Sequence, residues 1–87
     1  MKIKDGFILK SIAGTNIVVP TGSNTVSFGS VITLNESGVF LWERLSNDVT
    51  EEDLVTALLS EYSVDKATAK RDVKEFIEKL SKAELLI

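Results

Sequence analysis

Hydrophobic positions along the chain follow two different periods. In the first third, short apolar and β-branched runs occupy residues 7–12, 17–19 and 31–34, separated by glycine, proline and polar residues. Runs of this length and composition are typical of β-strands. Ala13-Gly14, with Thr15-Asn16 after it, lies between the first two runs and predicts a hairpin with a short turn.

After residue 34, apolar residues recur every three or four positions, which predicts amphipathic helices. Asn35, Thr50 and Asp65 are placed to cap three of them, the last being the longest and ending near Ala83. All five glycines and the only proline precede residue 39, so strands and loops come first and helices second. The expected apolar faces are Leu41, Trp42 and Leu45; Val55, Leu58, Leu59 and Tyr62; and Val73, Phe76, Ile77 and Leu80.

This order predicts a single α+β domain over residues 1–87, with strands within 7–34 and helices within 36–84. Trp42, at helical spacing with its apolar neighbours, is expected in the core. Gly38 weakens its helix by about 1 kcal/mol relative to alanine, which is tolerable if another element packs closely there. Glu75–Lys79 and Glu78–Lys82 have the spacing of stabilising ion pairs within a helix.

The composition is that of a globular domain without the usual catalytic chemistry. Of 87 residues, 44% are hydrophobic and 26% charged, and there is neither cysteine nor histidine. Disulfides, thiol nucleophiles, imidazole bases and metal sites with nitrogen or sulfur ligands are therefore excluded. The carboxylates of Glu51, Glu52 and Asp53 suit the first turn of a helix better than a Mg²⁺ site. We expect no catalytic residue, no metal and no cofactor.

Net charge and hydropathy restrict the expected cellular location of the protein and its expected binding partners. The formal net charge is −3, and residues 35–62 carry seven acidic residues and one arginine. This acidic balance argues against sequence-independent binding of nucleic acid. No apolar run has the length of a membrane span or of a signal peptide, so a cytoplasmic location is expected and no membrane partner.

Basic residues gather in the first half of the third predicted helix, at Lys66, Lys70, Arg71 and Lys74. They form either a solvated helix face or an anion-attracting surface beside a groove. Ile77 interrupts the stripe with an apolar side chain, which suits a partly covered groove better than an open face.

The residues Leu34-Asn35-Glu36-Ser37-Gly38, followed by Leu41-Trp42 and Leu45, resemble the L-N-x-[ST]-G-x-x-[IL]-W-x-x-L signature of the PqqD family. The resemblance extends over residues 7–87. It implies a winged-helix-like module, a three-stranded antiparallel sheet followed by a three-helix bundle. Members of this family are peptide chaperones, also called RiPP recognition elements. They bind the leader of a ribosomally made precursor peptide and present it to a modifying enzyme, often a radical SAM enzyme.

The family binds its leader as an added strand on the third strand, over the third helix. Carried over by position, the resemblance implies that Val31, Ile32 and Thr33 form the receiving strand. It also implies a helix face made of Lys66, Lys70, Arg71, Lys74, Ile77 and Ser81. An edge strand has unpaired N–H and C=O groups that an extended peptide satisfies, and long basic side chains suit leader carboxylates.

Two other interpretations of the function are compatible with the sequence. A winged-helix DNA-binding regulator is favoured by six of the ten basic residues lying in the third helix. The net charge and the acidic middle section oppose it. A scaffold or oligomerisation domain would have no peptide ligand and would dimerise through the exposed third strand.

Overall fold

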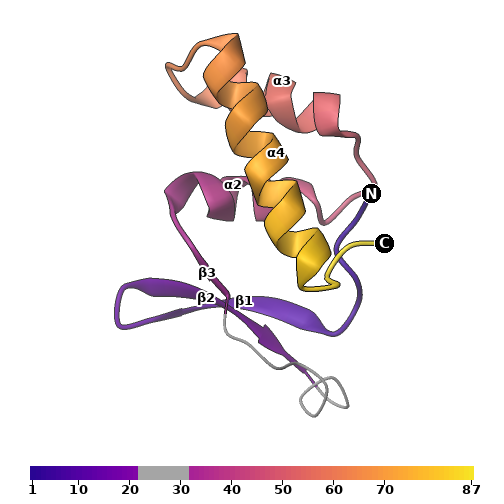
Figure 1. Cartoon of the computed structure of the whole chain (residues 1–87). Coiled ribbons are helices and arrows are strands. Elements are labelled where there is room, and N and C mark those ends of the chain that lie inside the picture. Colours follow the sequence, from indigo (N-terminus) through magenta and orange to yellow (C-terminus); the bar gives the residue numbers. More distant parts are fainter. Residues whose placement is uncertain (22–31) are drawn as a thin grey trace.

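A three-stranded antiparallel sheet precedes three helices in the computed structural model, which describes residues 1–21 and 32–87. The strand order is β1-β2-β3, and the helices lie on one side of the sheet (Figure 1). The α+β class expected from the sequence is confirmed. The elements are β1 (Phe7–Ile12), β2 (Thr15–Pro20), β3 (Ile32–Leu34), α2 (Glu36–Arg44), α3 (Glu51–Glu61) and α4 (Lys66–Lys82).

The β1–β2 hairpin has the short turn that the sequence predicts. Ile12 pairs with Thr15, so the loop consists of Ala13 and Gly14 alone. Both have positive φ, 52° and 79°, as a type I′ turn requires. This turn fixes the register of β2, which in turn positions β3 through the pairs Ile17–Thr33 and Val18–Ile32.

All three predicted caps are present. The side chains of Asn35, Thr50 and Asp65 each accept a hydrogen bond from the backbone N–H three residues later, at 2.8, 3.1 and 2.7 Å. Asp53 completes a capping box by accepting the N–H of Thr50 at 2.9 Å. These bonds satisfy backbone donors that a helix start leaves unpaired. The sequence therefore marks where each helix begins.

The Asp65 cap makes stability depend on pH. The hydrogen bond from the Thr68 backbone N–H lowers the pKa of the Asp65 carboxyl below its usual range. A lowered folded-state pKa means that the ionised cap stabilises the fold above the unfolded-state pKa and loses this effect as the pH falls through the folded-state value. We expect Asp65→Asn, which keeps the cap without a titrating group, to gain stability relative to the natural protein below about pH 4.

Urea unfolding of both proteins at several pH values between about 3 and 7 measures this difference. A difference in unfolding free energy that stays constant with pH would contradict the role of the Asp65 charge.

The core lies between the sheet and the helices. Trp42 is 8% exposed within it, so the expectation that it is a core residue is confirmed. No buried polar or charged residue occurs in the part of the chain that the structure describes. The sheet and the helices are therefore joined by apolar packing. The buried residues are Val18, Ile32, Leu34, Leu41, Trp42, Leu45, Leu54, Val55, Leu58, Ala69, Val73, Phe76, Leu80 and Leu85.

Gly38 lies where α2 approaches the end of β3. A Cβ atom at this position would lie 3.1 Å from Asn35 Oδ1 and 3.2 Å from Leu34 Cβ. The close packing that the sequence analysis required for this glycine is therefore present. Asn35 Oδ1 is held by the cap and Leu34 Cβ by the strand backbone, so neither neighbour moves freely.

We expect Gly38→Ala to lower the free energy of unfolding by about 1 kcal/mol, because the overpacking exceeds the gain in helix propensity. Urea denaturation measures the change. Glu43→Ala, on the exposed side of the same helix, is the control and should stay within about 0.5 kcal/mol. A Gly38→Ala protein more stable than the natural one would show that the site accommodates the methyl group.

Candidate functional site

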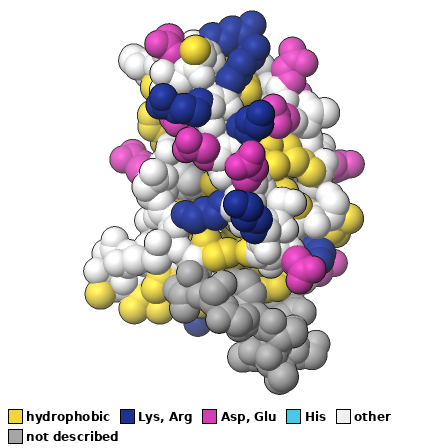
Figure 2. All heavy atoms as spheres, in the orientation of Figure 1, with side chains coloured by type: hydrophobic (Ala, Val, Ile, Leu, Met, Phe, Trp, Pro, Cys, Tyr) yellow, Lys and Arg dark blue, Asp and Glu magenta, His cyan; other side chains and the backbone are white. Residues whose placement is uncertain are grey.

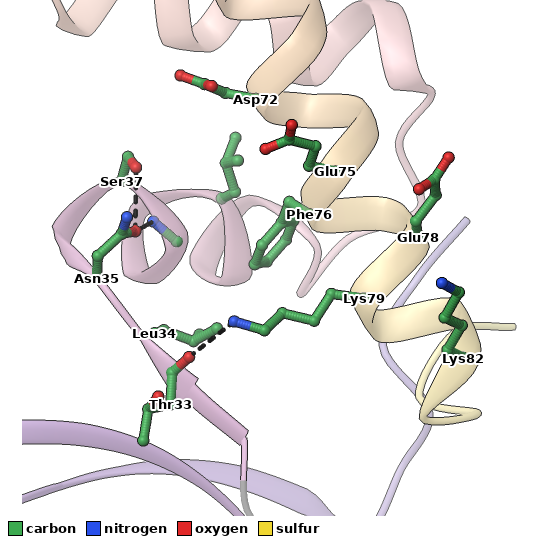
Figure 3. A pocket seen from close by; sticks show the side chains of 12 residues that line it. Thr33, Leu34, Asn35, Ser37, Asp72, Glu75, Phe76, Glu78, Lys79 and Lys82 are labelled. Carbon is green, nitrogen blue, oxygen red and sulfur yellow. Dashed lines mark hydrogen bonds between the residues drawn. The ribbon is translucent and has the colours of Figure 1, made fainter.

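A groove of about 720 Å³ separates β3 and the first turn of α2 from α4 (Figure 3). Strand and cap meet here because β3 leads through Asn35 directly into α2, and side chains of α4 line the other side of the groove. The groove is lined by Thr33, Leu34, Asn35, Ser37, Gly38, Leu41, Asp72, Glu75, Phe76, Glu78, Lys79 and Lys82.

The floor of the groove is apolar. Leu34, Leu41 and Phe76 line it, and all three are buried members of the core. Gly38 adds no side chain between them. Since a small open area of apolar surface is left among polar neighbours, the floor suits an apolar side chain of a ligand.

The open edge of β3 forms one wall. β3 pairs with β2 on one side, and on the other side Lys79 Nζ donates a hydrogen bond to the Thr33 carbonyl oxygen at 3.2 Å. The Thr33 C=O therefore points away from β2 and into the groove. The N–H and C=O of one strand residue point to the same side, so the Thr33 N–H also faces outward. Thr33 thus provides one donor and one acceptor to an added strand.

Charged side chains of α4 form the opposite rim. Asp72 and Glu75 point toward the first turn of α2, whereas Lys79 reaches down to Thr33 (Figure 3). The expected Glu75–Lys79 and Glu78–Lys82 pairs are wrong: among residues 1–21 and 32–87, the ion pairs within 4 Å are Met1–Asp48 and Arg71–Asp72. Lys79 bonds to the β3 backbone instead of Glu75.

The predicted receiving strand is placed as follows. Thr33 is exposed at the groove, and Ile32, the preceding residue of β3, is 6% exposed and part of the core. Ile32 therefore contributes to the scaffold that presents the strand edge. Val31 lies outside the described residues.

The predicted helix face divides into several places. Lys66 and Lys70 line a smaller cavity of about 480 Å³ against α3, together with Glu51, Glu52 and Leu59. Arg71 reaches the groove only through its ion pair with Asp72, at 3.7 Å. The remaining predicted residues line neither cavity: Lys74, Ile77 and Ser81. Peptide contact by these six residues is a prediction of the family resemblance, and a test of the lysines is given below.

Sequence reasoning missed the side of α4 that forms the groove, with Asp72, Glu75, Phe76, Lys79 and Lys82. The available signal was Phe76, which the apolar pattern assigned to the core. In a helix, positions 72, 75, 76 and 79 share one side. The apolar pattern fixes the core face but leaves open which of its two flanks meets β3.

The surface around the groove has mixed charge. Lys and Arg side chains alternate with Asp and Glu on the face that carries α4 (Figure 2). A nucleic-acid interface is expected to present a continuous basic patch, which this face lacks in the described residues. Within the same ranges, no group of His, Cys, Asp and Glu side chains could hold a metal ion, and no helix is long and apolar enough to cross a membrane.

Comparison with known protein families identifies the family of this chain. The model of the family PqqD, coenzyme PQQ synthesis protein D, matches residues 7–86. The chain belongs to the PqqD family. The family resemblance carried by the Leu34–Leu45 signature is thereby confirmed, and the groove described above is a feature of a PqqD-family domain.

Two solved structures resemble this PqqD-family chain over nearly its full length. "TbiB1 in Complex with the TbiA(beta) Leader Peptide" is 30% identical, with a TM-score of 0.75 over 99% of this chain and 94% of that chain. "Lasso peptide synthetase B1 complexed with the leader peptide" is 19% identical, with a TM-score of 0.73 over 97% of this chain and 93% of that chain, and shares the fold. No match is found among curated proteins.

Proposed function

We propose that this PqqD-family domain binds the leader segment of a ribosomally synthesised precursor peptide and presents it to a modifying enzyme. The observation that carries the proposal is the groove beside β3, where the Thr33 N–H and C=O face away from the sheet. The 30% identical TbiB1, solved with a leader peptide, supports it.

Strand addition explains the shape of the site. An extended leader segment lying along β3 accepts a hydrogen bond from the Thr33 N–H and donates one to the Thr33 C=O. Its side chains alternate, and those that face α4 cover the apolar floor at Leu34, Leu41 and Phe76. Lys79, which is exposed, leaves the Thr33 carbonyl at little cost because water solvates its ammonium group.

The chain acts as a binding partner, and the chemistry belongs to the enzyme that receives the leader-bound precursor. A radical SAM enzyme is one partner class associated with the family. Precursor and domain meet in the cytoplasm, where ribosomal peptides are made. No cofactor takes part in this role.

A peptide selection and amide exchange test the proposal. The whole chain is used to enrich binders from a displayed library of random twelve-residue peptides, and one enriched peptide is synthesised. Bound to the chain, it should protect the Thr33 amide from hydrogen exchange, because that N–H becomes part of a ladder. Absence of any enriched peptide, or binding without protection at Thr33, would contradict strand addition. Binding of random duplex DNA with a steep salt dependence would favour the DNA-binding reading instead.

The basic stripe gives a separate prediction. Lys66, Lys70 and Lys74 lie on the side of α4 away from the groove, so we expect their combined change to glutamine to leave the dissociation constant of the selected peptide within about twofold. Calorimetry at two salt concentrations measures it. A loss of about tenfold, together with a weaker salt dependence, would place the stripe in the peptide site.

A further inference from the structure

The groove has the acidic side chains Asp72 and Glu75 at one end, and Lys79, Lys82 and Glu78 at the other. Glu78 points away from Thr33, whereas Lys79 points toward it (Figure 3). Glu75 and Asp72 point from α4 toward the first turn of α2, where β3 has ended (Figure 3). One helical turn later, Lys79 points to Thr33 within β3, and Lys82 lines the groove beyond it. A helix rises about 1.5 Å per residue, so Glu75 and Lys79 are about 6 Å apart along its axis.

Neither Glu75 nor Lys79 is neutralised by a neighbouring charge. In the described residues, Glu75 has no cationic group within 4 Å, and the bond that Lys79 makes is to an uncharged carbonyl. Asp72 differs, because Arg71 lies 3.7 Å away. When an added strand supplies an N–H to the Thr33 carbonyl, the Lys79 ammonium group is released beside the bound peptide. Glu75 and Lys79 are thus the charges best placed to meet ligand side chains.

We propose that Glu75 and Lys79 select the charge order of the leader, an inference that rests on the proposed function. Both strand pairs of this sheet are antiparallel, and antiparallel pairs are the commoner kind, so the added strand is taken to run against β3. Its earlier residues then lie beside α2 and its later residues beside Ile32. A basic residue near Glu75 therefore precedes an acidic residue near Lys79.

Strand geometry sets the spacing of the two charges. Residues of a strand that face the same side are two apart and about 6.6 Å from each other. The separation of about 6 Å along α4 therefore corresponds to a basic and an acidic residue about two positions apart, both facing the helix. The ligand is an extended peptide with this order and with an apolar residue over Phe76.

The test uses the selected peptide and its charge-order isomer, in which the basic and acidic residues are exchanged at constant composition. Both are titrated by calorimetry into the natural chain and into the swap variant Glu75→Lys with Lys79→Glu. Each exposed ion pair contributes modestly to the binding free energy. One isomer forms two attractive charge pairs where the other forms two repulsive ones, so their dissociation constants should differ by about tenfold. The natural chain should prefer the peptide in which the base comes first, and the swap variant should prefer its isomer.

A matched control separates local recognition from net charge. Glu43→Lys with Lys10→Glu makes the same exchange at two exposed positions that line neither cavity, and it should keep the natural preference. Circular dichroism establishes that each variant is folded. The charge-order proposal alone would be overturned if peptides protect the Thr33 amide from exchange but the natural chain binds both isomers equally. The same holds if the swap variant prefers the same isomer as the natural chain. Failure to enrich any peptide that protects Thr33 would overturn the proposed function and this inference together.

Discussion

Thr33→Pro is expected to leave the domain folded and to weaken peptide binding at least about tenfold, whereas Ile32→Pro is expected to unfold the sheet. Thr33 directs its N–H away from β2, so proline removes a donor needed only by the ligand. Loss of one such hydrogen bond, together with the bulk of the proline ring at the strand edge, accounts for the expected factor. Ile32 instead directs its N–H to β2, so proline there breaks the ladder between Val18 and Ile32.

Circular dichroism and calorimetry with the selected peptide measure the two outcomes. Thr33→Ala is the control, because it changes the side chain and keeps the backbone donor, and its binding should stay close to that of the natural protein. A folded Thr33→Pro protein that binds the peptide with natural affinity would end the strand-addition mechanism. Unfolding of Thr33→Pro with a folded Ile32→Pro would show that the strand faces the other way.

The features that sequence predicted well are those set by local chemistry. A cap is formed by a side chain and an amide three residues apart, so Asn35, Thr50 and Asp65 could be assigned without knowledge of the rest of the chain. Gly38 could be assigned because a glycine inside a helix needs a close neighbour, which Leu34 provides. The short turn between the first two strands is equally local, although Thr15 and Asn16, expected between the strands, belong to β2.

The groove depends on how elements that are distant in the sequence pack together. The sequence pattern predicts only part of that arrangement. The apolar stripe of α4 fixes the side that faces the core, but two flanks border that side. One carries Lys66 and Lys70 and lies against α3; the other carries Glu75 and Lys79 and lies against β3. Both flanks have charged residues at helical spacing. The predicted helix face therefore lies on the flank with more lysines. Which flank faces β3 depends on how α4 is placed against the rest of the fold, which is a tertiary property.

Trp42→Ala is expected to lower the free energy of unfolding by about 3–5 kcal/mol, because it leaves a large cavity in the core. Trp42 is 8% exposed on α2 and belongs to the same buried cluster as Leu41 and Leu45. A domain of this size has a total stability of about 5–10 kcal/mol, so the variant would be close to unfolding. Its melting temperature should fall by at least about 12 °C.

The same change separates scaffold from site. Trp42 does not line the groove, so the folded fraction of Trp42→Ala should bind the selected peptide with close to natural affinity once calorimetry is corrected for the unfolded fraction. Trp42→Phe, which keeps most of the buried ring, is the matched control and should lose less stability. A Trp42→Ala protein with natural stability and no peptide binding would place Trp42 in the recognition surface, and the groove would then extend beneath α2.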